Sequence, residues 1–532
     1  MRTTQKRLWP FLVLLSCVGF VACTSHYFRA NYDSANQLLH ETENLQERPF
    51  LKAHMRNGDV YIFGEEWLVD TITNELVAYG AHYDFNRNKK AEQICKLPLD
   101  EVAIFETNMK IDTHKNGKIA ALSILAALDV GLGIVCLTTP KACFGSCPTF
   151  YMDPTQDFHY SDAEGFSNAI APCLEYTDID ALNNPSVDGL FSITMKNEAQ
   201  ETHCVNDLQL LAYPRSAGQR VFHSRSDKFY LCEGSVPPTL AVGSEGECTA
   251  LVSNRDGIER FRLANETDLA TREEVILEFE NPVGADQLGL VVSFRQTMMT
   301  TYFIYSAIGY MGNEVGDIFA SLETSDNPKG QFGGGLYEEL GDLEVEVWHE
   351  ASQAWIKQGG WYETGPIAVN EQIMPLNFYS GSTLRVRLTM TEGLWRIDHA
   401  ALTEIVGEVE PVSLSPTSIS LGGQDYSKGK KLLSNPEDYI ISMPGDEFLF
   451  DFEMPQAGQD YELFLSSTGY YLEWMRSEWI KDKDLWELRS MLKNPAQYLR
   501  DQASYYKTYE SQIEADFWNS RIDPNQFSYH EN

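Results

Sequence analysis

The densest group of cysteines in the chain is Cys143 and Cys147. They lie in the segment Lys141-Ala-Cys143-Phe-Gly-Ser-Cys147. Their C-x-x-x-C spacing is one residue longer than the C-x-x-C motif that tunes thiolates in thioredoxin-like proteins. Three interpretations stay open: half-cystines of structural disulfides, a redox pair, or a metal site completed by His159, His203 or Cys204. A structural metal site normally needs a second short pair of ligands, and the sequence shows none with that spacing. Structural disulfides are therefore the favoured interpretation.

A second set of candidate residues is aromatic. We expect a ligand platform on a sheet face, since aromatic rings that lie on such a face can stack on sugars. Its members are Trp348, Trp355, Trp361, Tyr362 and Trp395. The Trp-rich stretch 469–486 is instead expected to belong to a core or to a docking surface.

Other reactive side chains do not assemble into a recognisable motif. Asp153, Asp157, Asp162 and Glu164 cluster in sequence, but they lack the alternating spacing of a calcium loop, so a solvated face or turn caps are expected. His203 lies beside Cys204, but a nucleophilic Cys–His pair is not expected, because it would waste a thiol in an oxidising compartment. No phosphate-binding loop, dinucleotide fingerprint, zinc-protease helix or serine-hydrolase elbow is present. The sequence therefore predicts no catalytic residue, no cofactor and no metal, and whether the chain is an enzyme stays open, with a non-catalytic role favoured.

The first 22 residues have the layout of a signal peptide. Arg2, Lys6 and Arg7 precede an apolar run that starts at Leu8 and ends in small residues. The segment Phe20-Val21-Ala22-Cys23 resembles the lipobox of bacterial lipoproteins, in which cleavage precedes a cysteine that becomes acylated. Cys17 is the competing site, but cleavage there would leave an exposed apolar stub, whereas cleavage before Cys23 leaves a polar tether. The resemblance implies a lipid anchor at Cys23 in a cell membrane, and Thr24 in place of Asp favours the outer membrane.

The predicted export also bears on the remaining cysteines. When Cys17 leaves with the signal peptide and Cys23 carries lipid, an even number of cysteines is left in the mature chain, which is typical of a disulfide framework in an exported protein. No connectivity is assigned, because eight cysteines allow 105 pairings. They are Cys95, Cys136, Cys143, Cys147, Cys173, Cys204, Cys232 and Cys248.

Charge excludes one class of partner. The chain has 77 acidic and 41 basic residues, and its formal net charge is −36. Such a charge repels phosphate backbones, so nucleic-acid binding is excluded. A long apolar stretch at 119–137 has Asp129 at its centre, which favours a buried helix or a short helix–strand unit over a membrane span.

Strand patterns position the candidate residues. Clean alternation places Val275, Leu277 and Phe279 on one face, and the stretches 343–348, 383–390 and 446–452 repeat that pattern. A hairpin is predicted over 219–232, a helical insertion over 298–322, and a helix that begins at Asn494 and Pro495. The final strand at 393–402 resembles that of jelly-roll carbohydrate-binding modules, and this resemblance extends over 275–405.

The predicted class is mainly β with α, with a disulfide-rich first domain and an antiparallel sandwich in the middle. We expect a signal peptide (1–22), a tether (23–50), a Cys-rich α+β domain (51–252), a β-sandwich (253–405), a linker (406–430) and strands with C-terminal helices (431–532). The favoured function is a membrane-anchored envelope protein that binds a glycan or a protein. The alternatives are an extracytoplasmic thiol-redox or hydrolytic enzyme and a structural envelope scaffold.

Overall fold

A computed structural model describes most of the chain. The described residues are 26–32, 35–42, 50–55, 59–83, 89–111, 147–153, 160–170, 174–182, 189–199, 201–280, 287–312, 335–362, 365–377, 383–436, 438–473, 482–519 and 521. Cys17, Cys23, Cys136, Cys143 and Cys173 lie outside these residues, as do the signal peptide and the apolar stretch 119–137.

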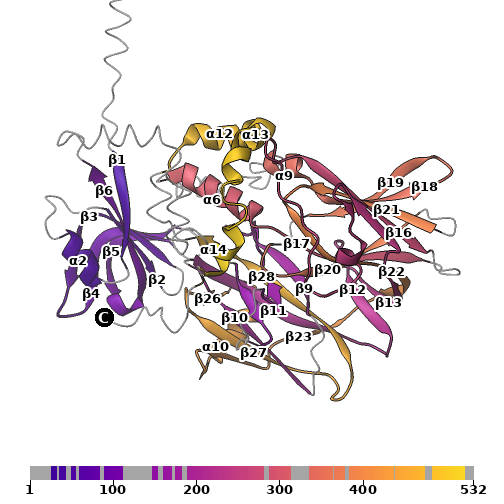
Figure 1. Ribbon diagram of the computed structural model, residues 1–532. Helices are drawn as coiled ribbons and strands as arrows, with labels where there is room; N and C mark the ends of the chain where they lie inside the picture. Colours follow the sequence, from indigo (N-terminus) through magenta and orange to yellow (C-terminus); the bar gives the residue numbers. More distant parts are fainter. Residues whose placement is uncertain are drawn as a thin grey trace, which may run out of the picture.

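The first part of the fold is a six-stranded antiparallel sheet (Figure 1). Its strands in spatial order are β1 (His26–Tyr32), β6 (Val102–Ile111), β2 (Phe50–Met55), β3 (Val60–Asp70), β4 (Glu75–Tyr83) and β5 (Lys89–Pro98), and α2 (Ala35–Thr42) accompanies them. Leu38 of α2 is fully buried against Phe63 and Trp67 of β3. The range 23–50, expected to be a tether, therefore contains a paired strand and a packed helix.

Two further sheets pack face to face and are called here the outer sandwich. One has the order β25 (Gln424–Asp425), β24 (Ser418–Leu421), β27 (Glu447–Glu453), β10 (Leu190–Lys196), β7 (Thr149–Tyr151), β8 (Ala163–Glu164). The other has the order β23 (Val412–Leu414), β11 (Glu201–Pro214), β28 (Tyr461–Glu473), β9 (Tyr176–Leu182), and β26 (Ile440–Ser442) also pairs with β11. Phe450 and Ile193 of the first sheet share a core with Leu208 and Leu465 of the second.

Between these segments in sequence lies the central sandwich. One layer is a closed barrel with the order β12 (Gln219–His223), β13 (Phe229–Val236), β22 (Trp395–Val409), β17 (Leu288–Gln296), β20 (Asn370–Leu376). The other is a sheet with the order β15 (Gly246–Glu247), β14 (Leu240–Gly243), β16 (Arg272–Glu280), β21 (Thr383–Thr391), β18 (Leu343–His349), β19 (Ala354–Trp361). Leu290 and Leu402 of the barrel share a core with Val275, Val345 and Val386 of the sheet.

The α-helices of the described chain other than α2 lie against the two sandwiches (Figure 1). They are α5 (Thr249–Val252), α6 (Met299–Met311), α9 (Gly335–Leu340), α10 (Lys428–Leu433), α12 (Leu485–Lys493), α13 (Pro495–Tyr506) and α14 (Ile513–Asn519). Phe303 of α6 and Leu499 of α13 join the central core, whereas Phe517 of α14 joins the outer core. No helix in the described ranges has the length and apolar character needed to cross a membrane.

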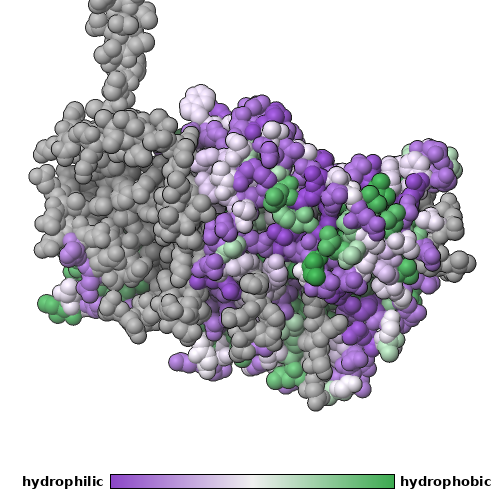
Figure 2. All heavy atoms as spheres, viewed as in Figure 1, coloured by the Kyte–Doolittle hydropathy of each residue, from purple (hydrophilic) through white to green (hydrophobic). Residues whose placement is uncertain are grey.

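The alternating patterns predicted from the sequence are confirmed. Val275, Leu277 and Phe279 are completely buried, and so are Phe448, Phe450 and Phe452 of β27. The hairpin of β12 and β13, the helix α6 and the helix α13 with Pro495 in its first turn also occur where expected. Figure 2 shows that hydrophilic residues dominate the visible face of the described part and that hydrophobic residues form small separate patches.

The predicted disulfide-rich domain is wrong for the cysteines that the structure describes. Cys95, Cys147, Cys204, Cys232 and Cys248 are all free and buried. The physical reason is that a free cysteine packs as a small apolar side chain, so an even count does not separate core thiols from half-cystines. Most of these five thiols lie in different cores: Cys95 in the first sheet, Cys232 in the barrel, and Cys248 between the layers of the central sandwich.

Strand pairing also joins segments that were expected to be separate. β10 and β11, inside 51–252, pair with β27 and β28, inside 431–532. Residues 406–430, expected to be a linker, contain the end of β22 together with β23, β24, β25 and the start of α10. The hydrophobic pattern shows where strands occur, but their partners are set by long-range packing.

Candidate functional site

The outer face of the six-stranded sheet in the central sandwich carries two of the predicted aromatic residues. Val347 of β18 points into the core and is completely buried, so Trp348, the next residue, lies on the opposite face. Trp355 of β19 is its direct cross-strand partner. Both rings are half-buried. With Arg385 and Arg387 of β21, these tryptophans form what is called here the Trp–Arg face.

Guanidinium groups cover the rings of this face. The centroids of Trp348 and Trp355 are 5.3 Å apart, and the rings meet edge to face at 68°. Arg385 lies 4.7 Å from the centroid of Trp348, and Arg387 lies 4.8 Å from that of Trp355, within the range of cation–π contacts. Arg387 also pairs with Glu346 at 2.6 Å, so the stacked groups are fixed in place.

The other predicted aromatic residues do not join this face. Trp361 and Trp395 are each only 1% exposed, and both rings pack against Phe294 in the core. Trp361 points inward because the pairing of β18 and β19 shifts between Val345 and Glu346, which brings Trp361 opposite the buried Leu343. Tyr362 is 50% exposed, and Arg225 lies 4.0 Å from its ring centroid. No coplanar pair of exposed rings is found among these five residues.

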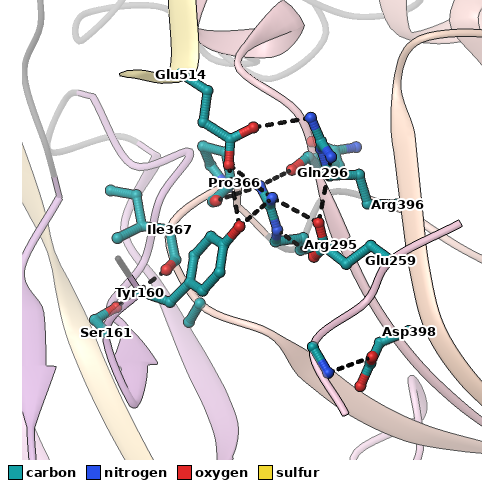
Figure 3. Close-up of polar contacts among 12 residues, drawn as sticks. Tyr160, Ser161, Glu259, Arg295, Gln296, Pro366, Ile367, Arg396, Asp398 and Glu514 are labelled. Atoms are coloured by element: carbon teal, nitrogen blue, oxygen red, sulfur yellow. Dashed lines mark hydrogen bonds and ion pairs between the residues drawn. The ribbon is translucent and has the colours of Figure 1, made fainter. Parts of the chain in front are cut away.

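A buried ion-pair network, which sequence analysis missed, joins the central sandwich to the C-terminal helix (Figure 3). Arg295 of β17 is fully buried and donates hydrogen bonds to Glu259 from Nε at 2.6 Å and from Nη2 at 2.8 Å. Nη2 also donates to Glu514 of α14 at 2.7 Å and to the Tyr160 hydroxyl at 2.8 Å. Arg396 of β22 pairs with Glu514 at 2.9 Å.

This network balances its own charge, because two arginines face two glutamates. Burial is the main cause that raises the pKa of Tyr160 to about 12, so its hydroxyl stays protonated and can donate to Glu514 at 3.3 Å. Such a neutral set of partners is typical of a structural lock, since a buried charge is tolerated only when it is paired. No sequence signal identifies it, because its members are far apart in the chain.

A second polar group surrounds Cys147, one of the predicted candidates. The Cys147 thiol donates to Glu164 Oε1 at 2.7 Å, and both groups are buried. Burial is the main cause that raises the pKa of Glu164 to about 7. Burial and the neighbouring Glu164 also raise the pKa of Cys147 well above its usual value. The expectation that Glu164 lies on a solvated face or in a turn cap is therefore wrong.

His203 and Cys204 do not form a nucleophilic pair. His203 Nε2 lies 2.6 Å from Glu201 Oε1, and both side chains are fully buried. Cys204, the next residue on β11, is fully buried in the core of the outer sandwich. Within the described ranges, no group of three or more histidine, cysteine, aspartate or glutamate side chains is placed to hold a metal ion.

Comparisons with known proteins give no family. No family model matches the chain, and no curated protein matches it. Among solved structures, one similar chain is the secreted serine protease VesC from Vibrio cholerae, with 8% identity over 70% of this chain and 75% of that chain. The TM-score of that comparison is 0.14, so no fold or activity is inferred from it.

Proposed function

We propose that this chain is a lipid-anchored envelope protein that binds a protein partner through the Trp–Arg face. The observation that carries the proposal is the pair Trp348 and Trp355, which are half-buried side by side on the outer face of a sheet and stacked with arginines. Tryptophan and arginine are the residues most enriched at the energetic centres of protein interfaces. Their fixed positions lower the entropy that binding would otherwise cost.

A protein partner is favoured over a glycan for a geometric reason. A sugar stacks on the flat face of an aromatic ring, and a platform for several sugars needs rings that share a plane. Trp348 and Trp355 are inclined at 68°, and a guanidinium lies over each ring. The Trp–Arg face thus presents ring edges, planar cations and flanking carboxylates such as Glu346. Such a combination suits a protein partner whose surface has both apolar and polar groups.

The membrane anchor in this proposal comes from the sequence alone. Its support is the apolar signal segment and the lipobox-like residues that end at Cys23. The mature N-terminus, isolated from a bacterial host and analysed by mass spectrometry, should carry lipid on Cys23. A Cys23→Ala variant should then remain unprocessed or leave the membrane fraction. A mature chain that begins at another residue without lipid would refute the anchor and leave the Trp–Arg face to be tested separately.

Site-specific photo-crosslinking tests the binding face. A photoreactive amino acid replaces Lys357, which is exposed and follows Trp355 by two residues on β19, so it lies on the same face as Trp355. In cells that naturally produce the protein, we expect one discrete crosslinked adduct with a partner protein. This adduct should disappear in the Trp348→Ala/Trp355→Ala variant. Trp486→Ala is the matched control, since Trp486 is 79% exposed on α12, and it should leave the adduct unchanged.

Two outcomes would count against this proposal. An adduct that persists in the double variant would show that the partner does not depend on the Trp–Arg face. The other outcome is slower migration of the purified protein in gels that contain soluble polysaccharide. If the double variant restores normal migration, the face binds a glycan instead.

A further inference from the structure

A small cavity lies where Cys147 and Glu164 meet the helices. The strand side of its wall includes Cys147, Glu164 and Tyr471, and the helix side includes Thr301 of α6 and Phe517 of α14. Its volume is about 30 Å³, which is room for about two water-sized groups. The cavity is therefore formed between the core of the outer sandwich and two helices, one of them the last helix of the described chain.

Cys147 and Glu164 have the geometry of a nucleophile and its base. The 2.7 Å hydrogen bond runs from the thiol to Oε1. Glu164 is oriented in turn through Oε2, which accepts from the Ile367 amide at 2.6 Å and from the Ala368 amide at 3.2 Å. A nucleophile in contact with a base that a third group orients is the common arrangement of activated cysteines and serines.

Ser167 gives an independent indication that something binds in this cavity. Its side chain lines the cavity and is only 7% exposed, yet Ser167 Oγ has no hydrogen-bond partner. A buried hydroxyl without a partner costs stability, so such groups usually face a ligand or an ordered water. Ser167 thus supplies a free donor and acceptor beside the Cys147 and Glu164 pair.

Helix α14 closes the cavity and is held by a polar latch. Phe517 lines the cavity, and Glu514, one turn earlier, is bound to Arg295 and Arg396 (Figure 3). α14 has seven residues and pairs with no strand, so its release would withdraw Ile513, Phe517 and Trp518 from the outer core without breaking a strand pair. Opening would widen a cavity that otherwise admits only water-sized groups.

We propose that Cys147 and Glu164 are a latent thiol-exchange site for low-molecular-weight disulfides, and that α14 is the lid that controls access to it. In the reaction, the Cys147 sulfur attacks one sulfur of the small disulfide R–S–S–R. The Cys147–S–S–R bond forms while the S–S bond of the reagent breaks. The thiol proton passes to Glu164 and then to the departing thiolate, which leaves as R–SH.

The closed state protects the thiol. Burial and the neighbouring carboxylate keep the pKa of Cys147 well above its usual value, so almost no thiolate exists while α14 is in place. The other ionisable groups that face this pair are Asp178 and Asp180 beside Glu164, and Glu201 and Tyr471 beside Cys147. None of these neighbours is a cation that would stabilise a thiolate, so exposure to water is the step that activates it.

The test measures the rate at which bis(2-hydroxyethyl) disulfide modifies Cys147 in the folded full chain, followed by peptide mass mapping. Glu514→Gln weakens the latch and should raise that rate about tenfold or more, since a charge-assisted hydrogen bond is lost. Asp516→Asn is the matched control, because it removes the same charge from the same helix outside the latch, and its rate should equal that of the wild type. Cys204 is fully buried in the core of the outer sandwich and does not line the cavity, so its modification reports unfolding of that core in the same sample.

Two further variants make the result decisive. Phe517→Ala removes the ring that lines the cavity and should also speed the modification of Cys147, even if Glu514→Gln proves unstable. Adding Glu164→Gln to the opened variant should slow the reaction about 100-fold, the range expected for loss of a general base. The proposal is refuted if Cys147 reacts no faster in both opened variants, if it reacts only in parallel with Cys204, or if Glu164→Gln has no effect.

Discussion

Arg295 and Arg396 lie directly opposite each other on β17 and β22, so two positive charges are neighbours across a strand pair. Glu259 and Glu514 each bind both arginines, and this arrangement cancels the repulsion. The network therefore depends on both glutamates being present. Each of them also brings another segment of the chain to the end of the barrel where β17 ends and β22 begins.

Replacement of Glu259 by Gln should destabilise the protein strongly. The side chain is 7% exposed, and its loss leaves the fully buried Arg295 opposite Arg396 with one carboxylate fewer. Removal of one partner from a buried pair costs about 3–5 kcal/mol of the free energy of unfolding. Urea unfolding measures the change, and Glu408→Gln is the control, since its pair with Lys228 is on the surface. Equal stability of the two variants would contradict the structural role of the network.

Two adjacent residues of β27 should respond very differently to truncation. Phe450 is completely buried in the outer sandwich, whereas Leu449 is 37% exposed on the other face. Phe450→Ala should lower the free energy of unfolding by about 3–5 kcal/mol, because it leaves a cavity in the core. Leu449→Ala should cost much less in the same unfolding experiment. A reversed order would show that the register of β27 is shifted by one residue.

The pH dependence of stability should change when Glu164 is replaced by Gln. Burial is the main cause that raises the pKa of Glu164 to about 7 in the folded state, above the value of 4.5 for a free side chain. The folded state therefore holds the proton more tightly. The resulting stabilisation is complete below pH 4.5, falls as the pH rises toward 7 and is absent above it, a total of about 3 kcal/mol. The free energy of unfolding, measured at pH 5, 6, 7 and 8, should change less with pH for Glu164→Gln than for the wild type. An equal pH dependence of the two proteins would exclude this assignment.

Thiol mapping checks the correction to the predicted disulfides. Iodoacetamide added in guanidinium chloride without reductant should alkylate Cys95, Cys147, Cys204, Cys232 and Cys248, because these thiols are free in the folded structure. The same reagent should react far more slowly with the folded protein, since all five are buried. Recovery of any of them in a disulfide-linked peptide would contradict the structure at that position.

The sequence predicted those features that depend on local periodicity. The alternation at 275–280 and 446–452 was enough to identify strands and their buried faces, and Val347 next to Trp348 already implied that Trp348 points outward. Trp361 could not be placed in this way, because the register shift in the β18–β19 pair reverses the face it occupies. The extra residue at this shift is Gln358, which lies between Lys357 opposite Glu346 and Gly359 opposite Val345.

Most side-chain contacts of the candidate sites could not be predicted from the sequence. Cys147 was singled out, but as a half-cystine, and Glu164 was dismissed as an exposed acid because adjacent acidic residues usually are. Burial of Glu164 depends on amides at Ile367 and Ala368, about 200 positions later in the chain. The latch likewise joins Arg295 to Glu514 across 219 positions. Side-chain pairing over such separations carries no local pattern.

The pairing of β11 with β28 has a consequence for biogenesis. Leu208 lies opposite Ser467, and the whole central sandwich, from β12 to β22, is synthesised between these two strands. The nascent chain therefore completes the inserted central sandwich while β11 is still unpaired with β28. A chain that stops before Tyr461 keeps every strand of the insert but leaves the surrounding sandwich open, so assembly of that sandwich must follow translation of β28.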